Sequence, residues 1–130
     1  MLNSPDFIFA WVGLLAIGAS PALINYHLAG KGLVHCLRLS GAKLVLMDGD
    51  EEALGRMEEV KGEFGGEVSF AELEDKRGEI YSSSNARPGD EYRTRMKANH
   101  AMALAYTSGT TGLPKGRCLN VMWLHTSDGH

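Results

Sequence analysis

The segment 106–116, YTSGTTGLPKG, concentrates residue types that can bind a phosphate group. It holds three glycines, four serine or threonine hydroxyls and one lysine. Glycines such as Gly109, Gly112 and Gly116 allow positive φ angles and a close approach of the backbone to a ligand. Successive backbone N–H groups can then form a concave anion site, and Lys115 adds a full positive charge. The combination fits a polyphosphate better than a neutral ligand.

The residues around Lys115 separate this segment from the P-loop of kinases and GTPases. A P-loop has glycine directly before the lysine and serine or threonine directly after it. Here Pro114 precedes the lysine and Gly116 follows it. The alternative without a ligand is a surface loop rich in small residues, which is common for an isolated glycine and serine cluster. The strand that we expect just before the segment favours the phosphate site.

Helix signals recur in the residues that lead to this segment. Ser4 and Pro5 predict the start of a helix over 5–17, because serine caps free N–H groups and proline fits the first helical position. This helix is apolar on nearly all faces, so we expect it to be covered on several sides. A second helix is predicted over 30–41, with Leu33 and Leu37 on one face and Gly41 as its stop.

Strands alternate with these helices. The apolar runs predict strands at 21–25, 43–48, 65–70 and 101–108, a third helix at 50–61 and a long polar loop at 75–99. This order predicts an α/β fold with helices layered on a mostly parallel sheet. In open α/β sheets, ligands bind beyond the carboxyl ends of the strands. The segment after residue 106 has that position.

The apolar stretch 7–24 raises the question of a membrane span. At 18 residues it is at the short limit for a spanning helix, Pro21 interrupts it, and Asp6 stands where a signal peptide has basic residues. We therefore favour a buried helix followed by a buried strand and keep a membrane segment as the alternative.

Composition narrows the class of protein. The net charge of −3 argues against binding to duplex nucleic acid, and 44% hydrophobic with 22% charged residues is typical of a soluble globular domain. Two cysteines without metal-type spacing favour a reduced, intracellular compartment. We assign no metal site. The acidic run 50–52 is expected to cap a helix, Cys36 to be a small core residue, and His35 to be packed or on the surface. We expect His125 and His130 to lie on the surface.

Two stretches carry a family resemblance. The residues LAYTSGTTGLPK, 104–115, match at every position the phosphate-binding signature of the adenylate-forming (AMP-binding) superfamily. The stretch 3–48, with its helix, ALIN, GK and L-H-C elements, resembles the N-terminal region of very long-chain acyl-CoA synthetases, also called fatty acid transport proteins. The polar stretch 75–99 matches least.

The resemblance implies an ATP-dependent fatty acid–CoA ligase with ATP, Mg²⁺ and CoA as co-substrates. Nucleotide and fatty acid are the implied partners, and a peroxisomal or endoplasmic reticulum membrane is the implied location. The implied phosphate-binding residues are Tyr106, Thr107, Ser108, Gly109, Thr110, Thr111, Gly112, Leu113, Pro114 and Lys115. No catalytic residue is assigned, because the family's adenine pocket, magnesium-binding glutamate, acyl tunnel and catalytic lysine all follow the signature.

The resemblance also bounds the domain. We expect 1–116 to be a partial, incomplete AMP-binding domain and 117–130 a divergent tail, where the family would continue into a helix. We expect such a fragment to be inactive alone and to retain none of the co-substrates. The alternatives are an adenylate-forming ligase for aryl acids or amino acids, and a truncated, non-catalytic product that binds a partner or a membrane.

Overall fold

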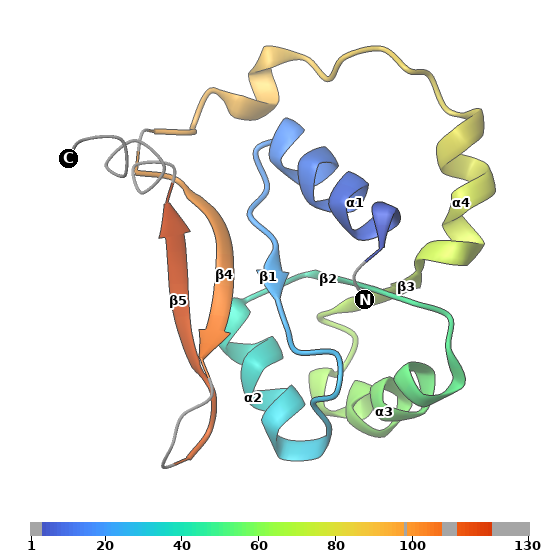
Figure 1. Cartoon of the computed structure of the whole chain (residues 1–130), viewed down its shortest axis with the longest axis vertical. Coiled ribbons are helices and arrows are strands. Elements are labelled where there is room, and N and C mark those ends of the chain that lie inside the picture. Colours follow the sequence, from blue (N-terminus) through green and yellow to red (C-terminus); the bar gives the residue numbers. More distant parts are fainter. Residues whose placement is uncertain (1–3, 98, 108–111, 121–130) are drawn as a thin grey trace.

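The computed structural model describes residues 4–97, 99–107 and 112–120 (Figure 1). Its elements follow one another as α1 (Pro5–Ala16), β1 (Ala22–Leu23), α2 (Gly30–Ser40), β2 (Leu44–Met47), α3 (Glu51–Lys61), η1 (Gly62–Phe64), β3 (Ser69–Glu72), α4 (Leu73–Ser82), η2 (Asp90–Arg93), β4 (Ala101–Thr107) and β5 (Lys115–Asn120). The predicted α/β class is confirmed, and the first five predicted elements lie within a few residues of their expected bounds.

The strands form two small sheets. β4 is central in the first sheet, where it pairs parallel to β1 and antiparallel to β5. β2 and β3 form the second sheet as a parallel pair, from Leu44 opposite Ser69 to Met47 opposite Glu72. Parallel pairing therefore predominates among the described strands, as expected, and β5 is the antiparallel exception.

The helix ends follow the local sequence. Ser4 caps α1, because its hydroxyl accepts a hydrogen bond from the Phe7 amide at 3.2 Å. Asp50 caps α3 by accepting from the Ala53 amide at 3.0 Å, which confirms the predicted role of the acidic run. Gly41 ends α2 with a φ of 63°, a left-handed conformation that favours glycine.

The core lies between α2, α3 and η1. Leu33 and Leu37 of α2 meet Val60 and Phe64, and all four side chains are buried. Cys36 is fully buried beside them, so its predicted packing role is confirmed.

Helix α1 differs from the prediction that it is covered on several sides. None of its residues is buried, and Ile8, Phe9 and Val12 are 50%, 68% and 59% exposed. α1 is tied to the first sheet by Trp11, whose Nε1 donates to the Met102 carbonyl at 3.2 Å. In Figure 1, α4 lies to the right of α1, and the chain after α4 passes above α1 to reach β4. Much of the apolar surface of α1 nevertheless stays exposed. None of the described helices is long and apolar enough to span a lipid bilayer.

Two predicted segments need correction. The strand expected at 65–70 is β3, at Ser69–Glu72. The loop expected at 75–99 contains α4 and η2. Ion pairs three residues apart, such as Lys76–Glu79 at 2.9 Å and Arg77–Glu74 at 3.2 Å, support α4, although none of its side chains is buried.

Candidate functional site

The predicted phosphate-binding segment connects β4 to β5. Thr107 at the end of β4 is paired with Lys115 at the start of β5, so the antiparallel pairing brings the two ends of the connection together. Among the predicted site residues, the structure describes Tyr106, Thr107, Gly112, Leu113, Pro114 and Lys115. Ser108, Gly109, Thr110 and Thr111 lie outside the described residues. The arrangement places the connection beyond the carboxyl end of β4, as predicted.

Thr107 and Lys115 are both exposed and face solvent from neighbouring strands. The Thr107 hydroxyl donates to the Lys115 carbonyl at 3.4 Å, a long bond that links the two strand ends. No carboxylate of the described chain forms an ion pair with the Lys115 ammonium. A cation on a strand end can therefore meet an anionic ligand without first breaking an ion pair there.

The Tyr106 side chain turns toward α2. Its hydroxyl donates to the Cys36 carbonyl at 2.7 Å. Burial, and then the neighbouring Cys36, raise the pKa of the Tyr106 phenol, which keeps the donor hydrogen in place. Its phenol therefore ties β4 to α2, and its predicted role as a phosphate ligand stays a prediction.

His35 contacts the other end of the connection. Its Nε2 lies 3.0 Å from the Pro114 carbonyl oxygen. A packed or surface position was predicted for His35, and nothing in its spacing indicated this partner 79 residues away. Gly116 also approaches α2 closely, because a Cβ added there would lie 3.1 Å from Leu39 Cδ2 and 3.2 Å from Leu104 Cδ1.

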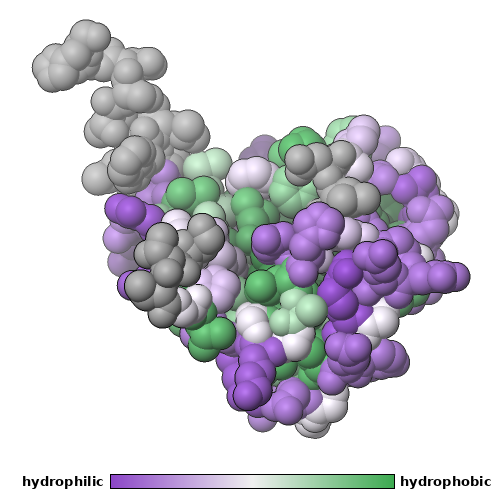
Figure 2. Space-filling view, turned by 60° about the horizontal axis from the view of Figure 1, so that its bottom comes forward, coloured by the Kyte–Doolittle hydropathy of each residue, from purple (hydrophilic) through white to green (hydrophobic). Residues whose placement is uncertain are grey.

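A cavity of about 770 Å³ separates the two sheets. Leu23 of β1 and Leu46 of β2 both line it, together with Trp11, Met57 and Tyr106. Figure 2 shows one face of the molecule, on which apolar surface is open to solvent between hydrophilic borders. The cavity can accommodate apolar groups, and its lining also includes polar side chains, among them His27, Lys43 and Asp48.

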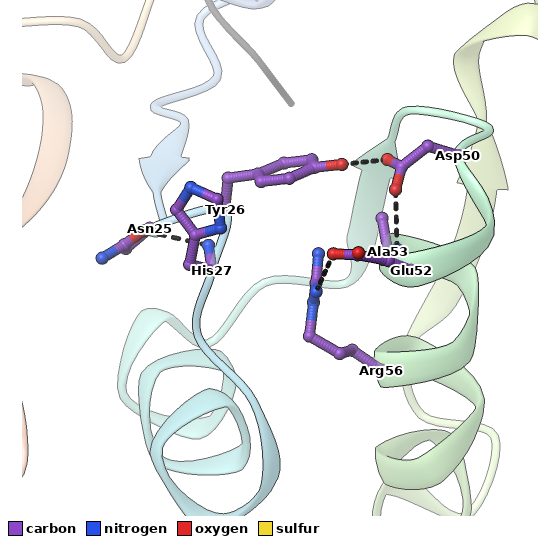
Figure 3. Close-up of polar contacts among 7 residues, drawn as sticks. All are labelled: Asn25, Tyr26, His27, Asp50, Glu52, Ala53 and Arg56. Carbon is purple, nitrogen blue, oxygen red and sulfur yellow. Dashed lines mark hydrogen bonds and ion pairs between the residues drawn. The ribbon is translucent and has the colours of Figure 1, made fainter.

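A polar cluster lies at the start of α3 (Figure 3). The Tyr26 hydroxyl donates to Asp50, and the Arg56 guanidinium lies 5.2 Å from the centre of the Tyr26 ring. The hydrogen bond from Tyr26, followed by that from the Ala53 amide, lowers the pKa of Asp50. The same bond raises the pKa of Tyr26. This cluster joins the residues after β1 to α3 and has the geometry of a structural contact.

Metal ligands are not grouped in the described part of the chain: it contains no cluster of three or more His, Cys, Asp or Glu suited to an ion. We therefore assign none of its side chains to Mg²⁺. His125 and His130 lie outside the described residues.

Comparisons with known proteins agree with one another. A family model described as AMP-binding enzyme matches residues 1–126. The chain is 36% identical over 118 residues to the very long-chain fatty acid transport protein of Cochliobolus heterostrophus, covering 88% of this chain and 17% of that protein. It is 35% identical over 140 residues to the Saccharomyces cerevisiae protein of the same name, covering 98% of this chain and 20% of the relative.

A solved structure supports the fold. The Mycobacterium tuberculosis fatty acyl CoA synthetase superposes with a TM-score of 0.77 at 21% identity, covering 95% of this chain and 23% of that one. The chain thus spans about a fifth of the length of these relatives. The family match continues past residue 116, and Lys115–Asn120 form β5, so the predicted boundary at 116 lies within a strand. That boundary stays a prediction.

Proposed function

This chain belongs to the family of AMP-binding enzymes, and from that premise we propose that it supplies the nucleotide-phosphate site of an ATP-dependent very long-chain fatty acid–CoA ligase. The observation that supports it most directly is the pairing of Thr107 with Lys115 at the carboxyl end of β4. This pairing holds both ends of a glycine- and hydroxyl-rich connection beside one exposed ammonium. The names of the relatives at 36% and 35% identity support the choice of acid.

The proposed reaction has two steps. The fatty acid carboxylate attacks the α-phosphate of ATP, which forms an acyl-adenylate and releases pyrophosphate. The thiol of CoA then attacks the acyl carbon, which forms the thioester and releases AMP with the thiol proton passing to solvent or base. Mg²⁺ would enter with ATP and offset phosphate charge.

This chain's residues act on the β- and γ-phosphates. Backbone amides and hydroxyls of 107–112 would donate hydrogen bonds to the phosphate oxygens, and Lys115 would offset the charge that collects on the departing pyrophosphate. Groups held in position before the reaction need no reorganisation during it, which is how such sites lower a barrier. The backbone conformation of the segment would be set by Tyr106, Leu113 and Pro114.

We propose that the 130-residue chain alone does not turn over. It spans about a fifth of the length of its relatives, whose other residues would have to complete the site. A ligase for aryl acids or amino acids is the alternative, since the phosphate segment does not select the acid. A second alternative is a non-catalytic role, in which the chain binds a partner or a membrane. The exposed apolar face of α1 favours it.

The test uses the purified chain with inorganic tripolyphosphate, followed by amide chemical shifts. We expect saturable shifts at Gly112, Leu113 and Lys115, and about tenfold weaker binding for Lys115→Ala, the size of one charge-assisted hydrogen bond. Lys61→Ala is the matched control, because Lys61 is an exposed lysine on α3. Equal binding by both variants would reject the site. Thioester formation from ATP, CoA and a long-chain fatty acid is expected to be absent, and turnover would contradict the proposed inactivity.

We further propose that the chain associates with membranes, peroxisomal or of the endoplasmic reticulum. Exposed apolar residues of α1 support a shallow surface contact, with Phe9 the most exposed of them. Co-sedimentation with neutral phosphatidylcholine vesicles tests this directly. Chain that stays in the supernatant at every lipid concentration would reject the proposal.

A further inference from the structure

Two consecutive residues of α2 hold the two ends of the β4–β5 connection. The Cys36 carbonyl accepts the Tyr106 hydroxyl at 2.7 Å, on the strand that enters it. His35 Nε2 lies 3.0 Å from the Pro114 carbonyl, where the connection enters β5. We infer that His35 is a positioning residue for the phosphate-binding segment, with α2 as the platform on which both of its ends are fixed.

The direction of the His35 bond follows from its partner. A carbonyl oxygen can only accept, so Nε2 must carry the hydrogen. Proline has no backbone N–H, and its carbonyl is therefore its one main-chain hydrogen-bonding group. A leucine at position 35 would remove the donor, whereas the amide of a glutamine can reach a similar position and still donate.

The bond also sets the orientation of the next peptide group. No cis peptide bond occurs in the described chain, so the Pro114 carbonyl and the Lys115 N–H point in opposite directions from one plane. A carbonyl held toward α2 fixes the direction of that amide. It also fixes the position of the Lys115 Cα, from which the side chain with the ammonium group extends.

Packing next to the bond supports the same role. Leu113 and His35 line one surface hollow, together with Val34 and Leu39 of α2. Gly116 lies so close to Leu39 that an added Cβ would be 3.1 Å from its Cδ2. The hydrogen bond is therefore one part of a contact in which β5 begins directly on α2, and the platform extends to both sides of Pro114.

The inference rests on the proposed function in so far as it names phosphate as the ligand. Without the His35 bond, the segment would sample more orientations and would lose entropy when a phosphate orders it. We expect His35→Leu to bind tripolyphosphate about two- to tenfold more weakly, the range for one net hydrogen bond, and His35→Gln to recover most of that loss. His27→Leu, at an exposed histidine before α2, should bind like the unchanged chain.

Amide hydrogen exchange of the ligand-free chain provides a separate readout. We expect His35→Leu to speed amide exchange at Leu113 and Lys115 about two- to tenfold, as for binding, with no change at Val60 in the core. The ¹⁵N spectrum of the unchanged chain at alkaline pH should also show hydrogen on Nε2 of His35. Neither measurement needs the variant to bind phosphate, and the second needs no variant.

The outcomes separate the two proposals. Weaker binding by His35→Leu with recovery in His35→Gln, or hydrogen on Nε2 with faster exchange at Lys115 in His35→Leu, supports the positioning role. Equal defects in the leucine and glutamine variants, unchanged exchange at Leu113 and Lys115, or hydrogen on Nδ1 alone would overturn it. Failure of the unchanged chain to bind tripolyphosphate would instead reject the proposed function, while exchange and tautomer still decide whether His35 holds Pro114.

Discussion

Helices α1 and α2 have nearly the same length, 12 and 11 residues, but opposite environments. α2 buries Leu33, Cys36 and Leu37, contacts both α3 and β5, and holds the β4–β5 connection. α1 is the more apolar in sequence, yet none of its residues is fully buried. Apolar composition therefore indicates what a helix could bury, whereas burial itself requires a partner surface within reach.

The cavity between the sheets accounts for part of this difference. Among the described strands, β1 pairs with β4 alone and β2 with β3 alone, and residues of β1 and β2 line the cavity. α1 lies on this open side and contributes Phe7, Trp11 and Leu14 to the lining. α2 lies instead where Val60, Phe64 and the β5 strand complete its surroundings. Stability should therefore be concentrated around α2.

The largest expected effect is on the core face of α2. Leu37→Ala should lower the free energy of unfolding by about 2–5 kcal/mol, because a fully buried leucine leaves a cavity. Val12→Ala on α1 should cost less than about 0.5 kcal/mol, because Val12 is 59% exposed. Urea denaturation followed by circular dichroism gives both values. Equal losses would show that α1 is covered in solution.

The same contrast explains what the sequence could predict. Ser4, Gly41 and Asp50 mark helix ends by local chemistry, and the structure confirms all three. α4 was missed because no buried face gives its residues a periodic pattern; ion pairs between exposed side chains support it instead. The signature residues predict a phosphate site after β4, which stays a prediction. The contacts of Tyr106 and His35 with α2 join residues far apart in the chain, which no local pattern records.

A smaller effect is expected at the polar cluster that joins the residues after β1 to α3. The pKa of Asp50 is lowered in the folded chain, chiefly by the Tyr26 hydrogen bond. A lowered pKa stabilises the fold above the ordinary aspartate range, and the contribution is lost as the pH falls through the folded value. Asp50→Asn should therefore lower the unfolding midpoint at neutral pH and converge with the unchanged chain under acid conditions. A difference in unfolding midpoint between Asp50→Asn and the unchanged chain that stays constant at all pH values would contradict this. In a Tyr26→Phe background, this difference at neutral pH should be smaller.

The smallest effect on stability is expected at the exposed face of α1. Phe9 is 68% exposed, so Phe9→Ser removes little buried surface and should change the free energy of unfolding by less than about 0.5 kcal/mol. Its effect should be seen in association instead, as weaker binding to phosphatidylcholine vesicles and less self-association in sedimentation velocity. A large loss of stability would mean that α1 is packed against protein in solution. Unchanged binding to vesicles and unchanged self-association would mean that another apolar surface is responsible for them. The cavity-lining residues of β1 and β2 would then be the next to alter.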